Sequence, residues 1–183
     1  MCDVRLGGFG RWAVSSAEMI VALLILGLAA AIAIPRLGQA QAHESGVEDQ
    51  TRHALRVLRT AIELYHRDHG AWPGNDPADP LATPAESARL FLQQIAGSTD
   101  AQGRAVERPD REHPFGPYVR GQFPACTFGP ARGSREILVI DTTDAPRALP
   151  DTPRYGWIYN RSSGAIVVNC DLTDESGTRY DSY

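Results

Sequence analysis

The chain has 183 residues, of which 43% are hydrophobic, and its formal net charge is −4. That length suits one domain with an appendage, and the acidic balance offers no basic surface for the counterion release that drives nucleic-acid binding. Nucleic acid is therefore not expected as a partner.

The N-terminal region combines a short basic segment with a long apolar run. Residues 1–13 are glycine-rich with a net positive charge, and residues 19–34 contain no charged or hydrogen-bonding side chain. As a helix, residues 14–34 would extend about 31 Å, which matches a bilayer core of roughly 30 Å. The pattern predicts a cytoplasmic leader over residues 1–13 and one transmembrane helix over residues 14–35. The alternative is a secretory signal peptide cut after the alanines at 29–31, which would release a soluble protein.

Glu18 stands near the start of this apolar run. A lone charge at membrane depth costs about 2.5–3.5 kcal/mol even on the more lenient insertion scales. Either the glutamate reaches the headgroup region, or a partner cation compensates its charge.

The sequence around this glutamate resembles the N-terminal class III signal of type IV pilins and type II secretion pseudopilins. The matching residues are Ala13-Val14-Ser15-Ser16-Ala17-Glu18-Met19, Gly27 and Ala33-Ile34-Pro35-Arg36-Leu37. In that family a prepilin peptidase leaves a glutamate as the fifth residue of the mature chain, with a proline seventeen residues further on. Glu18 and Pro35 are seventeen residues apart. The resemblance implies cleavage between Ala13 and Val14 and N-methylation of Val14, although the family usually has glycine and phenylalanine at these two positions.

The resemblance also implies how subunits would assemble. The mature amine of Val14 would pair with Glu18 of a neighbouring subunit, where a low dielectric strengthens the attraction. Pro35 would kink the helix because it lacks the N–H for the helical hydrogen bond. The implied protein is a structural subunit of a type II secretion pseudopilus or a related pilin-like filament, and not an enzyme.

The implied partners are copies of the chain itself, other pseudopilins, the prepilin peptidase, an inner-membrane assembly platform and membrane lipid. The implied location is the inner membrane, crossed once, with the globular part outside the cytoplasm and assembled into a periplasmic or surface filament. No cofactor is implied.

Beyond the proline, apolar residues recur at steps of three and four between Val47 and Tyr65, and charged residues fill the other faces. This pattern predicts an amphipathic continuation of the helix over residues 36–70. Gly70 and the Trp-Pro pair that follows predict its end near His69. This end also resembles the end of the long helix in pseudopilins.

Residues 71–183 are predicted to form a globular α+β region outside the cytoplasm. Thr83-Pro84-Ala85-Glu86 has the pattern of a capping box with proline at the first helical position. It predicts a helix to about Ala96 that buries Leu90, Phe91 and Ile95. Residues 98–114 are polar without a period and predict a surface loop.

Strand chemistry dominates the last third of the chain. The patterns at residues 136–141, 155–160 and 165–170 predict strands, and the turn at 161–164 joins the last two as a hairpin. The predicted fold is α+β: a long N-terminal helix packed on a small antiparallel β-sheet, as in pilins. The tail over residues 171–183 is predicted to be loose.

Candidate chemical sites are few. Cys126 and Cys170 are the only thiols beyond the apolar run, and an oxidising compartment would permit a disulfide between them, which the sequence leaves open. His66 and His69 lie three residues apart, but no third ligand is indicated, so no metal site is predicted. The acidic tail lacks the calcium-loop pattern of major pseudopilins. No nucleophile elbow, phosphate loop or zinc-helix motif occurs, so no catalytic residue is predicted.

Two functional classes remain open at this point. The first is the filament subunit, either of a secretion pseudopilus or as a minor pilin of a type IV or DNA-uptake pilus. The second is a signal-anchored extracytoplasmic binding module that does not polymerise. Methylation at Val14 would discriminate between the two classes.

Overall fold

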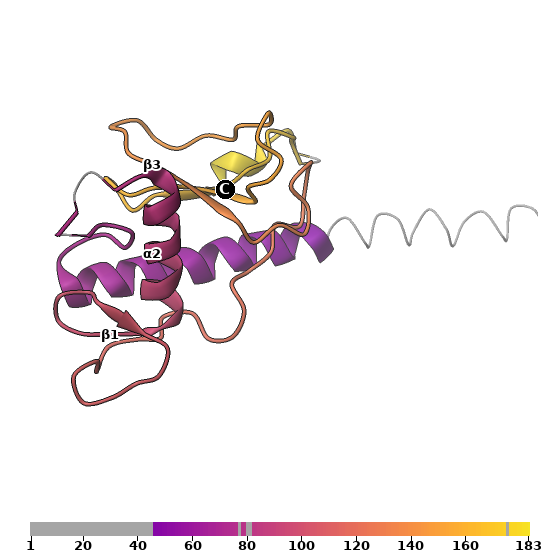
Figure 1. Cartoon of the computed structure of the whole chain (residues 1–183). Coiled ribbons are helices and arrows are strands. Elements are labelled where there is room, and N and C mark those ends of the chain that lie inside the picture. The colour runs from indigo at the N-terminus through magenta and orange to yellow at the C-terminus, as the bar shows by residue number, and fades with distance from the viewer. Residues whose placement is uncertain (1–45, 77, 80–81, 175) are drawn as a thin grey trace, which may run out of the picture. The chain divides into compact units, whose positions relative to one another are not determined.

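A long helix over residues 46–69 is the first element that the structure describes (Figure 1). The computed structural model describes residues 46–76, 78–79, 82–174 and 176–183. The predicted leader, membrane span and cleavage signal lie outside the described residues. So do the site residues named for them, which are Ala13, Val14, Glu18 and Pro35. Within the described ranges, no helix is both long enough and apolar enough to cross a membrane.

The long helix is amphipathic over its described length, as the sequence predicts. Leu55 and Leu58 lie on its covered face and are 1% and 0% exposed. The helix ends at His69, as predicted, and the Gly70 N–H donates to the carbonyl of His66 at 2.7 Å. Gly70 has a φ of +69°, a left-handed conformation that glycine adopts without a Cβ penalty.

The second helix, α2 (Pro84–Ala96), crosses the long helix (Figure 1). Its predicted capping box is present. The Thr83 N–H donates to a carboxylate oxygen of Glu86 at 2.8 Å, and the Glu86 N–H donates to the Thr83 hydroxyl at 3.3 Å. These bonds satisfy backbone donors that the first helical turn leaves without a partner, which explains why the helix begins here.

Three strands form a sheet in the order β3 (Ile137–Ile140), β4 (Trp157–Asn160) and β5 (Ile166–Val168). β4 and β5 pair antiparallel, which confirms the predicted hairpin. β3 and β4 pair parallel, so the prediction of an antiparallel sheet is wrong and the sheet is mixed. The connection over residues 141–156 is long enough to carry the chain back to the starting end of the sheet, as a parallel pair requires.

The core lies between the two helices and the sheet. Phe91 and Ile95 of α2 have no exposed surface, as predicted, whereas Leu90 is only half-buried. Trp157 and Tyr159 of β4 are also fully buried, and the ring centroids of Phe91 and Tyr159 lie 4.5 Å apart. The described residues therefore form an α+β unit with one hydrophobic core.

A two-stranded ribbon, β1 (Ser98–Thr99) with β2 (Ala105–Val106), lies where a surface loop was predicted. That prediction is wrong for its first residues, because both residues of β1 are buried, and so is Asp100. The Asp100 carboxylate accepts hydrogen bonds from the N–H groups of Gln102 and Arg104 at 2.9 Å each. Polar contacts rather than an apolar pattern hold this ribbon together.

The tail over residues 171–174 and 176–183 packs against the domain, so the prediction of a loose tail is wrong. It contains a turn of 3-10 helix, η1 (Tyr180–Ser182). Tyr180 is 7% exposed, and its ring stacks on that of Phe128 with centroids 4.1 Å apart. Leu172 is 54% exposed, so the rings of Tyr180 and Tyr183 supply the apolar surface that fixes the tail.

Candidate functional site

The tail is attached to the long helix through a cluster of five residues that we call the C-terminal clasp. Its members are Glu48, Arg52, Asp174, Tyr180 and Tyr183. Arg52 donates to Asp174 at 3.4 Å and to the Tyr183 hydroxyl at 3.0 Å, and its guanidinium lies 4.4 Å from the centroid of the Tyr183 ring. The Tyr180 hydroxyl donates to Glu48 at 2.8 Å. The clasp therefore joins two segments more than 120 residues apart in the sequence.

Asp174 is the acceptor at the centre of the clasp. One of its carboxylate oxygens accepts from the Ser176 hydroxyl at 2.6 Å and from the N–H groups of Ser176 and Thr178 at 2.8 Å each. The other oxygen accepts from Arg52 and from the Tyr183 hydroxyl. These donors, with the Ser176 hydroxyl contributing most, lower the pKa of Asp174 to about 2. The Asp174 carboxylate therefore fixes the tail to the long helix through these hydrogen bonds.

We expect Asp174→Asn to lower the melting temperature at neutral pH. The folded-state pKa of Asp174 lies below the unfolded value of about 3.9, so its charge stabilises the fold above that value. This stabilisation is lost as the pH falls from about 4 to about 2. Melting curves should therefore show a gap between native protein and variant that narrows over this pH window.

Asp171→Asn is the matched control for that variant. Asp171 is an exposed aspartate of the same tail, and no hydrogen bond to its carboxylate is recorded in the described part of the chain. Its variant should melt within a few degrees of the native protein at neutral pH, as most surface substitutions do. An Asp174→Asn gap that stays constant down to pH of about 2 would contradict the role given to this carboxylate.

Two cavities flank the clasp, of about 540 and 420 Å³, and both are lined by Arg59 and Tyr183. Arg59 donates to the carbonyl of Ile166 at 3.3 Å and to that of Tyr183. Partial burial lowers the pKa of Arg59. Among the described residues, no histidine or cysteine lines either cavity.

The two histidines at the end of the long helix take part in packing and hydrogen bonding. His69 Nε2 lies 2.9 Å from the Thr99 hydroxyl and 3.1 Å from the Tyr118 hydroxyl, and burial lowers the pKa of this histidine. The His66 ring stacks on Trp72 with centroids 3.8 Å apart. Among the described residues, no three histidine, cysteine, aspartate or glutamate side chains come together as a metal site. The contact between His69 and Thr99 therefore joins the end of the long helix to β1.

Cys126 and Cys170 are both buried and both free thiols in the structure. The Cys126 thiol donates to the carbonyl of Phe128 at 3.1 Å, and burial raises the pKa of both cysteines. A raised pKa makes a thiol less reactive at neutral pH. The sequence leaves a disulfide between them open, and in the structure their two sulfur atoms are not joined.

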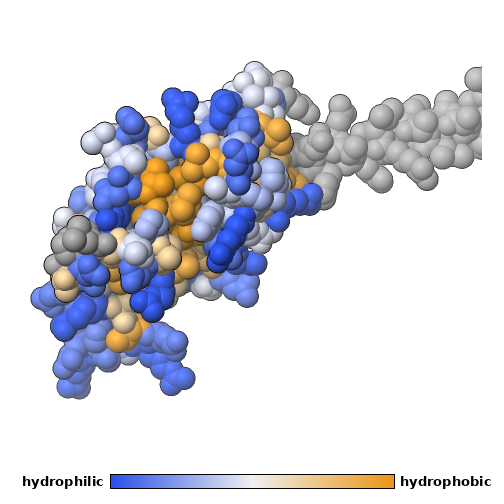
Figure 2. Space-filling model, turned by 45° about the horizontal axis from the view of Figure 1, so that its top comes forward, coloured by the Kyte–Doolittle hydropathy of each residue, from blue (hydrophilic) through white to orange (hydrophobic). Residues whose placement is uncertain are grey.

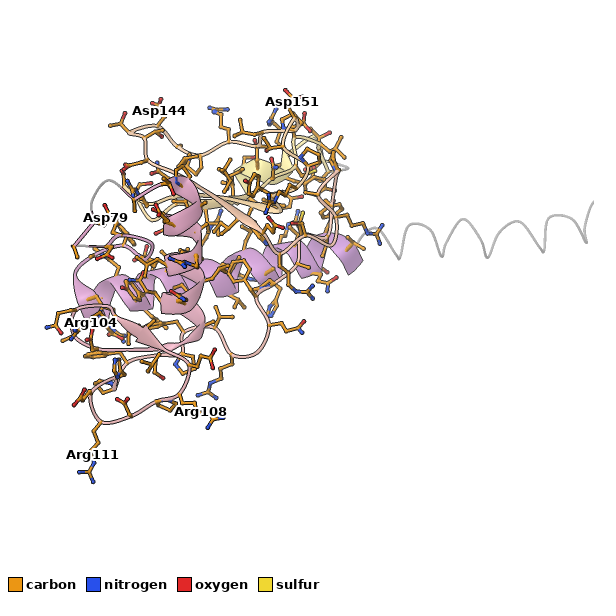
Figure 3. All side chains as sticks on the ribbon, viewed as in Figure 1. Asp79, Arg104, Arg108, Arg111, Asp144 and Asp151 are labelled. Atoms are coloured by element: carbon orange, nitrogen blue, oxygen red, sulfur yellow. The ribbon has the colours of Figure 1, made fainter. Side chains whose placement is uncertain are left out.

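The charged side chains that Figure 3 labels at the periphery do not converge on a common point. Figure 3 shows Arg104, Arg108 and Arg111 projecting outward on one side, whereas Asp144 and Asp151 project outward on the opposite side. A catalytic or binding constellation needs groups that face one another across a pocket. These charges therefore define no site.

Comparison of the chain with protein-family models, with curated proteins and with solved structures gave no match. The assignment of a function therefore depends on the sequence signal and on the geometry of the described domain. Sequence reasoning missed the clasp. The signal that could have found it is the presence of Tyr180 and Tyr183 in a tail that otherwise lacks large aromatic side chains.

Proposed function

We propose that the protein is a structural subunit of a type IV pilin-like filament, such as the pseudopilus of a type II secretion system. The observation that carries the proposal is the register between Glu18 and Pro35 within one long apolar run. A signal peptide or a simple membrane anchor has no need of a carboxylate there, because the charge makes insertion more costly. In a filament the Glu18 carboxylate has a role, because it pairs with the N-terminal amine of a neighbouring subunit.

The geometry of the described residues supports a subunit in which the globular domain is firmly attached to the long helix. The long helix buries one face under the domain, with Leu58 and Ile62 at most 1% exposed. The clasp adds polar contacts from Glu48 and Arg52 to the tail. In the proposed filament, N-terminal helices pack along the shaft and domains of this kind coat it. The fold is then pilin-like, with the mixed sheet covering the helix.

The proposed mechanism is assembly and not chemistry. Prepilin peptidase cuts between Ala13 and Val14, and the new amine of Val14 is methylated. The carboxylate of Glu18 on an incoming subunit meets the amine of a neighbour inside the membrane, and this pair fixes the register of addition. In a secretion pseudopilus, growth of the filament from an inner-membrane platform moves exoproteins outward.

The N-terminal mass of the membrane-extracted protein tests this function. The measurement compares the wild-type strain with one that lacks prepilin peptidase. We expect a mature chain that starts at Val14 and carries one added methyl group in the wild type, and the uncut chain in the other strain. A start at Met1 in both strains, or a start after Ala31, would exclude the filament class. A start at Met1 would indicate an uncut, membrane-anchored domain, and a start after Ala31 would indicate a secreted domain.

A further inference from the structure

The cavity of about 420 Å³ beside the clasp is lined by more cations than anions. Arg52, Arg56 and Arg59 reach it from the long helix, and Asp174 is the single carboxylate side chain among its described lining residues. Spacings of four and three residues place successive arginines side by side on a helix, where like charges repel one another. The positive charge of this lining therefore exceeds what its own side chains offset.

The recorded ion pairs at this cavity all belong to Arg52. Its guanidinium lies 3.4 Å from the Asp174 carboxylate and 3.9 Å from that of Glu48. Asp174 is in turn held by hydrogen bonds from the tail. The carboxylates nearest the cavity are thus engaged with one of its three arginines.

Arg56 and Arg59 line the same cavity without a side-chain carboxylate for either among the described residues. Arg56 is exposed, and no hydrogen bond, ion pair or ring contact of its side chain is recorded in that part of the chain. Arg59 donates to the main-chain oxygens of Ile166 and Tyr183. These bonds fix the Arg59 guanidinium in the cavity wall, next to the unengaged Arg56.

Charged side chains alone are ordinary on this molecule, since the face in Figure 2 is hydrophilic apart from one stripe of hydrophobic side chains. The cavity differs because its arginines gather around a hollow that also has an apolar part. Leu55, which is 1% exposed, contributes to the lining, and so does Tyr183. The Ser176 hydroxyl in the wall already donates to Asp174. The guanidinium groups therefore supply the donors that a ligand would meet.

We propose that this cavity binds a phosphate group between Arg56 and Arg59. The fork of a guanidinium group matches two oxygens of a phosphate at once. A carboxylate has only two oxygens, which a single guanidinium can occupy, whereas a phosphate group has further oxygens for the second arginine. The phosphate can belong to a free phosphate ester or to the headgroup of a phospholipid. The site lies within the described domain, so the interaction goes beyond the filament function and does not depend on it.

Equilibrium dialysis of radiolabelled inorganic phosphate against the full chain in detergent tests the site. Sodium chloride holds the ionic strength constant, so that general screening does not mimic binding. We expect saturable binding to the native chain. Arg56→Gln should weaken it by at least about tenfold, because it removes a charged donor from the phosphate. Arg56 is exposed and has no recorded partner, so the change should leave the fold intact.

Arg111→Gln is the matched control. It removes the same charge from an arginine that projects outward (Figure 3) and does not line the cavity, so phosphate should bind as to the native chain. Equal binding by the native chain and the Arg56→Gln variant overturns the site. The absence of saturable binding to the native chain overturns it as well.

Competition with the bound phosphate identifies the source of the group. Glycerol phosphate carries it without hydrocarbon, and dihexanoyl phosphatidic acid carries it with two short acyl chains. Equal displacement by the two indicates a free phosphate ester. Displacement by the lipid at a concentration lower by at least about tenfold indicates a headgroup whose chains contact the apolar part of the cavity. Displacement by acetate as readily as by glycerol phosphate overturns the assignment of a phosphate group.

Discussion

Leu58→Ala is expected to lower the free energy of unfolding by about 2–5 kcal/mol. Leu58 has no exposed surface and lies on the covered face of the long helix, at the contact with the rest of the core. Removing its three outer carbons loses the transfer free energy of those atoms and leaves a cavity that the surroundings fill only in part. Since total stability of a domain is about 5–15 kcal/mol, this single change removes a large share of it. Urea unfolding of the full chain in mild detergent measures the loss.

Leu149→Ala is the matched control, because the same atoms are removed from a side chain that is 42% exposed. Its expected loss is within about 0.5 kcal/mol, as for most surface substitutions. Similar losses for the two variants would contradict the placement of the long helix against the core. A large loss for Leu58→Ala alone supports the helix as the element on which the domain is built.

The helices could be predicted well from the sequence because their signals are local. The apolar period that contains Leu58, the glycine at position 70 and the Thr83 capping box each act over one or two turns, and each is found where the sequence placed it. The β4–β5 hairpin is local as well, since its turn lies between adjacent strands. Local signals of this kind do not depend on the rest of the fold.

The direction of β3 and the position of the tail could not be predicted in the same way. Strand direction depends on where the 141–156 connection runs, and buried Asn160 holds that connection through bonds of 2.8 and 3.0 Å to the carbonyls of Thr142 and Asp144. The clasp likewise joins Arg52 to a residue far along the chain. Contacts over such separations leave no period in the sequence, because single polar side chains make them.

Glu18→Ala is expected to abolish filament assembly without stopping membrane insertion or N-terminal processing. The substitution removes a charge from an apolar run, which makes insertion less costly. It also removes the partner of the Val14 amine on a neighbouring subunit, and a charge left without its partner at membrane depth opposes addition of the next subunit. Filaments sheared from cells and counted by electron microscopy measure assembly, and carbonate extraction of membranes measures insertion.

Glu112→Ala is the control, because it removes the same charge from an exposed position on the 98–114 loop and should leave assembly intact. The N-terminal mass then separates two ways in which the prediction can fail. If Val14 is methylated and Glu18→Ala still forms filaments, the chain is a processed pilin-like subunit whose register is fixed by another contact. If the Glu18→Ala variant is left uncut, the carboxylate acts in recognition by the peptidase. The loss of filaments would then say nothing about pairing between subunits, and a variant that is cut but lacks the carboxylate would be needed to test the amine–carboxylate contact itself.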